Sequence, residues 1–192
     1  GLSREHSMTL LSFEKPAALA DRAELERVAS LCRSAGVDWH RLTYHNRPGI
    51  PATIYDIAMG IRKAKRLARA INADVVHARS YIAGIMAMAV KRATRAKFIF
   101  DMRGFWPDER VDGGIWKIGS ARYKVFKNVE RQLFVSADHV VSLTNAGVNE
   151  IRKFDYLDGR VPSTSVIPTC TNLDLFHPAA ARDTATPGFT LG

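Results

Sequence analysis

Residues 97–109, KFIFDMRGFWPDE, decide how the rest of this 192-residue chain is interpreted. The segment 98–100 is an apolar run of strand-forming side chains, and polar chemistry begins abruptly at Asp101. Gly104 and Pro107 then oppose the continuation of a strand or a long helix. The pattern therefore predicts a buried strand that ends in a loop.

The loop after this strand carries candidate functional side chains. In an open α/β sheet, ligands bind beyond the carboxyl ends of the strands, so a site is expected here. The loop supplies Asp101, Arg103, Trp106, Asp108 and Glu109. The alternative is a surface turn ordered by an ion pair between Asp101 and Arg103, because charged residues are common in loops.

Composition describes an ordinary globular protein with a basic surface. Hydrophobic residues make up 46% of the chain and charged residues 24%, which excludes a wholly disordered protein. The two cysteines indicate neither a disulfide framework nor a metal cluster, and no apolar run could span a bilayer. We see no secretory leader and expect a cytoplasmic protein. The net charge of +9 favours an anionic partner such as nucleic acid, acidic lipid or a phosphorylated substrate.

Strand and helix patterns alternate along the chain. Strands are predicted at 8–13, 37–44, 74–77, 97–101, 139–143 and 164–167. Helices are predicted at 16–36, 54–71, 81–90, 120–136 and 145–154. This alternation is typical of βαβ units and predicts a Rossmann-like α/β fold, with a parallel sheet covered by helices on both faces. The glycine motifs for dinucleotides and nucleoside triphosphates are absent from the sequence.

Four motifs occur in an order that resembles one known family. They are DVVHAR (74–79), FDMRGFWPDE (100–109), ADHVVSLT (137–144) and VIPTCTNLDLFHP (166–178). Together they resemble the amino-terminal, acceptor-side domain of GT-B glycosyltransferases, most closely family 4 of the retaining enzymes. Two positions depart from that pattern: Arg103 stands where the family usually has a histidine, and Asn172 replaces an acidic residue.

The resemblance implies a domain layout. Residues 1–176 would form the Rossmann-like acceptor-side domain, and 177–192 would form the interdomain linker and the start of a carboxyl-terminal domain. The chain would lack the first strand of the family's sheet, whose order is 3-2-1-4-5-6. A gap would then separate the strands at 8–13 and 74–77, leaving backbone groups unpaired at about 1–3 kcal/mol each. We expect a neighbouring chain, as a homo-oligomer joined through the sheet, or a shifted pairing to fill it.

The resemblance also implies an activity. The full enzyme would transfer a sugar from a nucleotide-sugar donor to a glycan or lipid-linked acceptor with retention, in cell-envelope polysaccharide biosynthesis. No metal or further cofactor is expected. The isolated chain would be inactive, because catalysis in an interdomain cleft needs both walls in place. The catalytic residues would be Asp101 and Arg103. The substrate-binding residues would be His77, Arg79, Ser80, Trp106, Asp108, Glu109, Thr144 and Asn145.

Each of these residues has a plainer interpretation. His77 could end its strand with a hydrogen bond to the backbone, and Arg79 and Ser80 could serve only to cap the next helix. Asp101 could merely order the loop, and Trp106 could pack that loop onto the core.

Two other functions stay open from the sequence. A GT-B nucleotide-sugar epimerase would share the fold, although Arg103 is a poor proton carrier. A non-catalytic anion-binding module would explain the charge. No nucleic-acid partner is expected, because no RNA- or DNA-binding motif occurs.

The helix predicted at 54–71 has a basic side. We expect it to dock on an anionic membrane, placing the protein peripherally at the inner membrane face, since family 4 enzymes with lipid-linked acceptors often associate this way. The alternative is a solvated helix face, with the apolar side packed on the core. The membrane-contact residues would be Arg62, Lys63, Lys65, Arg66 and Arg69.

Overall fold

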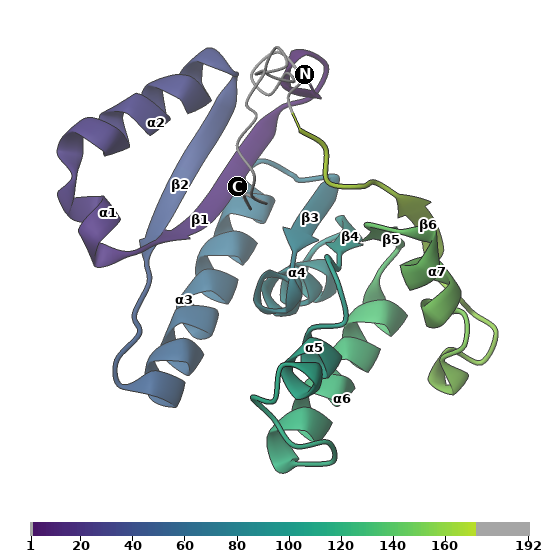
Figure 1. Ribbon diagram of the computed structural model, residues 1–192. Coiled ribbons are helices and arrows are strands. Elements are labelled where there is room, and N and C mark those ends of the chain that lie inside the picture. Colours follow the sequence, from purple (N-terminus) through teal and green to yellow (C-terminus); the bar gives the residue numbers. More distant parts are fainter. Residues whose placement is uncertain (1, 172–192) are drawn as a thin grey trace, which may run out of the picture.

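The computed structural model describes residues 2–171, in which strands and helices alternate as the sequence pattern predicts (Figure 1). The strands are β1 (Met8–Glu14), β2 (Val37–Thr43), β3 (Val75–Arg79), β4 (Lys97–Asp101), β5 (His139–Ser142) and β6 (Ser163–Val166). The helices are α1 (Pro16–Ala20), α2 (Arg22–Ser34), α3 (Gly49–Ala70), α4 (Tyr81–Ala93), α5 (Trp106–Asp112), α6 (Ala121–Ser136) and α7 (Asn145–Ile151). Short 3-10 turns are η1 (Leu2–Arg4) and η2 (Asp155–Leu157). The expected linker and strand at 177–192 lie outside the described residues.

The strands form two parallel sheets flanked by helices. One sheet pairs β1 with β2, and the other has the order β3-β4-β5-β6. Parallel pairing follows from the helical crossover that separates each strand from the next. The Rossmann-like α/β class predicted from the sequence is therefore confirmed. The strands follow the expected order, with a gap between β1 and β3 where the family's first strand would lie.

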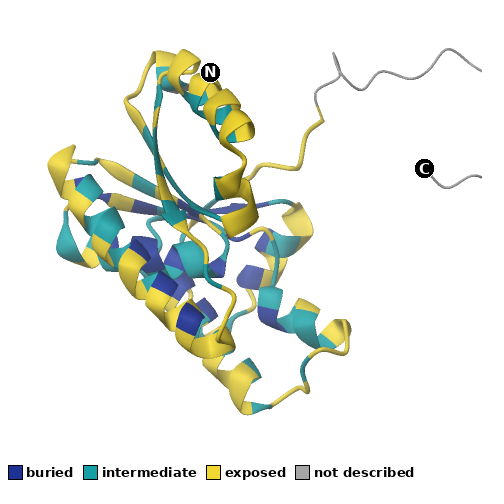
Figure 2. Cartoon of the chain, turned by 90° about the vertical axis from the view of Figure 1, so that its left-hand side faces the viewer, coloured by how far each residue is buried: buried dark blue, intermediate teal, exposed yellow. Residues whose placement is uncertain are grey.

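The core surrounds β4. Phe98 and Phe100 have no exposed surface, and Phe100 meets the rings of Tyr81 and Phe134 edge to face at centroid distances of 5.8 and 5.6 Å. Burying each such ring stabilises the fold by about 1.5–3 kcal/mol. In Figure 2 the buried residues lie mainly in the four-stranded sheet and its helices, whereas α1 and α2 contribute none. The core therefore holds the strand that leads into the candidate site.

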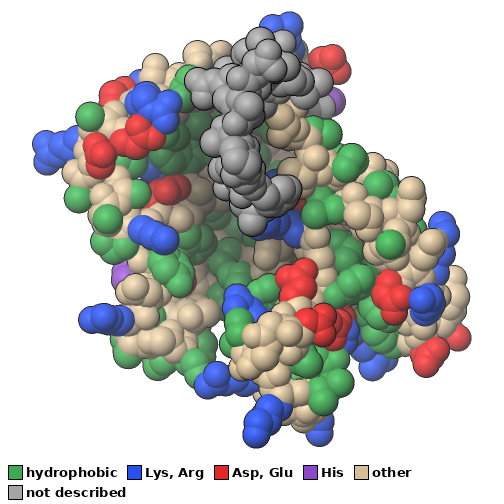
Figure 3. Space-filling view, viewed as in Figure 1, with side chains coloured by type: hydrophobic (Ala, Val, Ile, Leu, Met, Phe, Trp, Pro, Cys, Tyr) green, Lys and Arg blue, Asp and Glu red, His purple; other side chains and the backbone are tan. Residues whose placement is uncertain are grey.

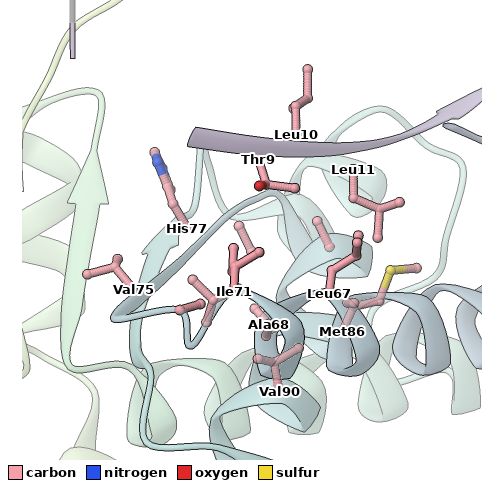
Figure 4. Close-up of a pocket in the computed structure, with 16 residues that line it drawn as sticks. Thr9, Leu10, Leu11, Leu67, Ala68, Ile71, Val75, His77, Met86 and Val90 are labelled. Carbon is pink, nitrogen blue, oxygen red and sulfur yellow. The ribbon is translucent and has the colours of Figure 1, made fainter. Parts of the chain in front are cut away.

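An open slot separates the two sheets (Figure 4). It has a volume of about 200 Å³ and lies between β1 and β3, with α3 and α4 beneath it. Leu67, Ala68, Met86 and Val90 line this floor. The expectation that a shifted pairing would close the gap is wrong for this chain, because within residues 2–171 β1 pairs only with β2 and β3 only with β4, while α3 and α4 pack against each other beneath the slot. Filling by a neighbouring chain stays a prediction.

Several element boundaries differ from the sequence-based ones. The helix predicted at 16–36 breaks at Asp21, whose side chain accepts a hydrogen bond from the Glu24 amide and so caps α2. Helix α3 begins at Gly49, five residues early, since proline is tolerated in a first helical turn. The predicted loop contains α5 for the same reason, with Pro107 in its first turn. No helix among residues 2–171 is long and apolar enough to cross a membrane.

Candidate functional site

A hollow of about 560 Å³ lies beyond the carboxyl ends of β4 and β5. Its walls come from the segment after β4, including α5, and from the turn into α7. The lining residues are Met102, Arg103, Gly104, Phe105, Asp108, Glu109, Asp112, Ser142, Leu143, Thr144, Ala146, Gly147, Glu150 and Phe154. We call this hollow the strand-end pocket. It occupies the edge of the sheet where ligands bind in open α/β folds.

Two tight turns shape the strand-end pocket. Arg103 adopts a left-handed backbone conformation, with φ of 61°, and the Gly104 amide donates to the Met102 carbonyl at 2.7 Å. On the other wall, a Cβ atom on Gly147 would come within 2.5 Å of the Ser142 hydroxyl. A side chain at Gly147 would therefore have to displace the Ser142 hydroxyl, which donates to the Thr144 carbonyl at 3.1 Å.

The pocket is acidic although the protein is basic. Asp108, Glu109, Asp112 and Glu150 line it beside a single cation, Arg103. Acidic side chains gather on the surface around α5 (Figure 3). Carboxylates accept hydrogen bonds from hydroxyl groups, and a guanidinium can bind a phosphate bidentately. The pocket can thus hold a polyhydroxylated molecule whose charged end faces Arg103.

A second group of predicted residues meets where β3 and β4 end. The carboxylate Oδ2 of Asp101 lies 3.8 Å from His77 Nε2 and 3.7 Å from Arg79 Nε, distances that are too long for hydrogen bonds. The other oxygen, Oδ1, is buried and has no hydrogen-bond partner within residues 2–171. Buried polar atoms are normally paired, so Asp101 is an incompletely satisfied carboxylate at the strand ends, and its side chain is 13% exposed.

The remaining predicted residues are distributed differently. Thr144 lines the pocket but also caps α7, where its hydroxyl accepts from the Gly147 amide at 3.0 Å. Ser80 holds the N-cap position of α4 without a capping side-chain bond, and Asn145 is exposed outside the lining. Trp106 packs against Tyr81, Trp116 and Phe126 at centroid distances of 4.8–5.9 Å. The strand-end pocket therefore combines Arg103, Asp108, Glu109 and Thr144 of the predicted set.

A buried network supports the α5 wall. The Glu130 carboxylate has no exposed surface; it accepts from the Tyr81 hydroxyl at 2.5 Å and from the Lys127 ammonium. Lys127 also donates to Asp108 at 3.1 Å, and Tyr123 donates to Asp108 at 2.8 Å. Burial raises the pKa of Glu130, while the bonds from Lys127 and Tyr81 oppose that rise. The network therefore holds the pocket carboxylate of Asp108 in place through side chains of α6.

Sequence reasoning missed part of this arrangement. Glu150 lines the pocket because it follows Ala146 by one helical turn on α7, a spacing that was readable once β5 was placed. Glu130 was also detectable, since it falls three residues before buried Leu133 on an otherwise apolar helix face. Asp112 gave no comparable signal, because the predicted loop around it had no fixed geometry.

A parallel α/β domain with its site at the strand ends is the architecture of one half of a GT-B glycosyltransferase. The solved structure of Glycyrrhiza uralensis UGT73P12 complexed with glycyrrhetinic acid 3-O-monoglucuronide shares this fold, with a TM-score of 0.52 and 9% sequence identity. The match covers 86% of this chain and 43% of that one, so the chain spans less than half the length of that neighbour.

The chain belongs to the glycosyl transferase 4-like domain family, whose model matches residues 2–168. The recognition made from the four motifs is thereby confirmed. No curated protein matches the sequence.

Proposed function

We propose that this chain is the acceptor-binding half of a transferase that moves a sugar from a nucleotide-sugar donor to a glycan or lipid-linked acceptor with retention. The observation that carries the proposal is the strand-end pocket of a glycosyl transferase 4-like domain, with hydroxyl-binding carboxylates around one guanidinium. No metal is required in this proposal. Cell-envelope polysaccharide is the substrate setting that the resemblance favours.

Asp101 and Arg103 are the proposed catalytic residues. A retaining transfer develops negative charge on the leaving diphosphate, which an exposed guanidinium such as Arg103 can stabilise. The Asp101 carboxylate, whose side chain is 13% exposed, can accept a hydrogen bond from the sugar or the acceptor. His77 and Arg79 flank that carboxylate and can orient it or share its ligand.

We also propose that α3 docks on an anionic membrane surface. The five basic residues named above form no salt bridge within residues 2–171. The first half of the helix adds exposed apolar side chains at Ile50, Ile54 and Tyr55, which are 54–64% exposed. Basic residues near an anionic leaflet contribute about 1 kcal/mol each, and shallow apolar contact adds to this. The protein would then sit peripherally at the inner face of the membrane.

Two alternatives make different predictions. A nucleotide-sugar epimerase needs groups that remove and return a proton, which carboxylates can do, so the products of the assay below distinguish it from a transferase. A non-catalytic anion binder would present a basic pocket, whereas this pocket holds four carboxylates and one arginine. The pocket lining therefore favours transfer over anion binding.

The test is an assay of the complete transferase that carries this chain, with a panel of nucleotide sugars and saccharide acceptors. We expect a new glycosidic bond whose anomeric configuration, read by NMR, matches that of the donor. Turnover should persist in a metal chelator and be absent from the 192-residue chain alone. An epimerised nucleotide sugar without transfer, or inversion at the anomeric carbon, would contradict the proposal.

A further inference from the structure

A histidine and a buried carboxylate form a close pair where β2 ends. His45 follows that strand in the loop that leads to α3, and Asp56 lies on α3 with only 5% of its surface exposed. The Oδ1 atom of Asp56 is 2.6 Å from His45 Nδ1, and its Oδ2 atom accepts the His45 backbone amide at 2.7 Å. Both carboxylate oxygens are therefore used by the same histidine.

The pair fixes the state of the imidazole ring. An ionised carboxylate can only accept, so the neutral ring must carry its proton on Nδ1 and present a lone pair on Nε2. The His45 side chain is 43% exposed, and its Nε2 atom has no hydrogen-bond partner among residues 2–171. The ring therefore presents an oriented, unoccupied acceptor atom to the solvent.

The hydrogen bonds of the buried carboxylate within residues 2–171 all go to His45, one to its backbone and one to its ring. Helix α3 begins at a Pro48 cap without any side-chain hydrogen bond, so Asp56 does not cap it. An apolar residue could fill the same space without the desolvation that an ionised group suffers. Its use at this position is therefore tied to the orientation of His45.

One aromatic ring packs against this imidazole. The Tyr55 ring meets it edge to face at 5.5 Å and is 54% exposed, and Tyr44, the residue before His45 in the chain, is 39% exposed. Exposed aromatic faces beside an oriented polar atom suit a sugar ring, which has apolar faces and hydroxyl edges. Because His45 follows β2 in the chain, this group lies at a carboxyl strand end, as the strand-end pocket does.

We propose that His45, held by Asp56, accepts a hydrogen bond from a saccharide hydroxyl and forms an outer acceptor subsite with Tyr55. This inference rests on the proposed transferase function. It assigns a sugar-recognition role to a strand end that contributes no residue to the strand-end pocket.

The first test is nitrogen NMR of the histidine rings in the 192-residue chain. We expect His45 to show the Nδ1-protonated form and its Nε2 resonance to move when methyl glycosides or inositol are added to tens of millimolar. His40 is the matched control, because its Nε2 atom lies 2.9 Å from Asp38 and is already engaged. Protonation on Nε2, no response, or a response to inorganic phosphate alone would overturn the proposal.

The second test uses the complete transferase. His45→Phe keeps a ring but removes the acceptor atom, so it should raise the acceptor KM by about tenfold, the loss expected for one hydrogen bond, and leave the donor KM unchanged. His40→Phe should change neither. An unchanged acceptor KM in an active His45→Phe enzyme would overturn this inference alone, whereas a wild-type enzyme without transfer would overturn the proposed function instead.

Discussion

Replacement of Lys127 by methionine tests the buried network behind the α5 wall. The change keeps an apolar stem of similar length but leaves the fully buried Glu130 carboxylate with one donor, the Tyr81 hydroxyl at 2.5 Å. Removing one partner of a buried ion pair typically destabilises a protein by 3–5 kcal/mol. Lys127 is itself 26% exposed, so we expect a loss of about 3 kcal/mol, the lower end of that range.

The effect should depend on pH in a defined direction. Burial already raises the pKa of Glu130 above its value in the unfolded chain, and loss of the ammonium raises it further. The folded variant then binds a proton that the unfolded chain does not, so its stability falls as pH rises through that interval. The difference between Lys127→Met and wild type should be smaller near about pH 5 than near about pH 8.

Urea unfolding followed by tryptophan fluorescence measures this difference, since Trp106 and Trp116 pack against the supported wall. Lys153→Met is the matched control: it removes an exposed pair with Glu150, worth less than about 0.5 kcal/mol. Combining Lys127→Met with Glu130→Leu should recover at least about half of the loss. A loss below about 0.5 kcal/mol, or one independent of pH, would refute the network's role.

Three further outcomes follow from the packing and pairing of the chain. Gly84→Ala should lower the free energy of unfolding by about 1 kcal/mol, because the new Cβ would meet the buried Leu133 side chain at 2.7 Å, and this overpacking outweighs the gain in helix propensity. An unchanged thermal midpoint would contradict this contact. Partial burial opposes ionisation of Asp138, but hydrogen bonds from Lys91, the Phe98 amide and Lys97 lower its pKa to about 2. Wild-type stability should therefore fall between about pH 4 and 2, whereas the stability of Asp138→Asn should not, and parallel acid-unfolding curves for the two proteins would argue against this pairing. In the monomeric chain, slot-facing amides of β1 and β3 should exchange hydrogen at least about tenfold faster than those of β4, which is paired on both sides. Equal protection of the monomer would contradict the open slot, whereas protection that appears only on self-association would mean that a neighbouring chain fills it.

The sequence predicts most of the fold because its signals are local. The FIF run of β4 and the small apolar residues of α4 specify a buried strand and a buried helix, and both occur where expected. The break at Asp21 was not foreseen, since a capping side chain within an apolar pattern is a weak signal against a continuous helix. The sequence also predicted a gap between the strands at 8–13 and 74–77, and the structure has an open slot there. Whether such a gap closes depends on how the helices pack, which the spacing of apolar residues along the chain does not specify.

The candidate site was less predictable than the fold. Arg103, Asp108, Glu109 and Thr144 were found because they follow strand ends in the sequence, and they meet in one pocket. Trp106 shows the limit of this reasoning, since its ring packs among Tyr81, Trp116 and Phe126. The pair of His45 and Asp56 escaped notice because the two residues lie on different elements, and only the packing of the loop against α3 brings them together.

The central claim is that the strand ends of this domain bind and position the substrates of sugar transfer. Its most direct test compares transfer rates and thermal midpoints for Asp101→Asn, Arg103→Gln and Arg131→Gln in the complete transferase, the last being an exposed arginine outside the pocket. We predict that the first two lower the rate at least about a hundredfold, the scale of one lost transition-state contact, with midpoints near wild type. Equal rates in all three variants, or rate losses that merely follow losses of stability, would contradict the claim.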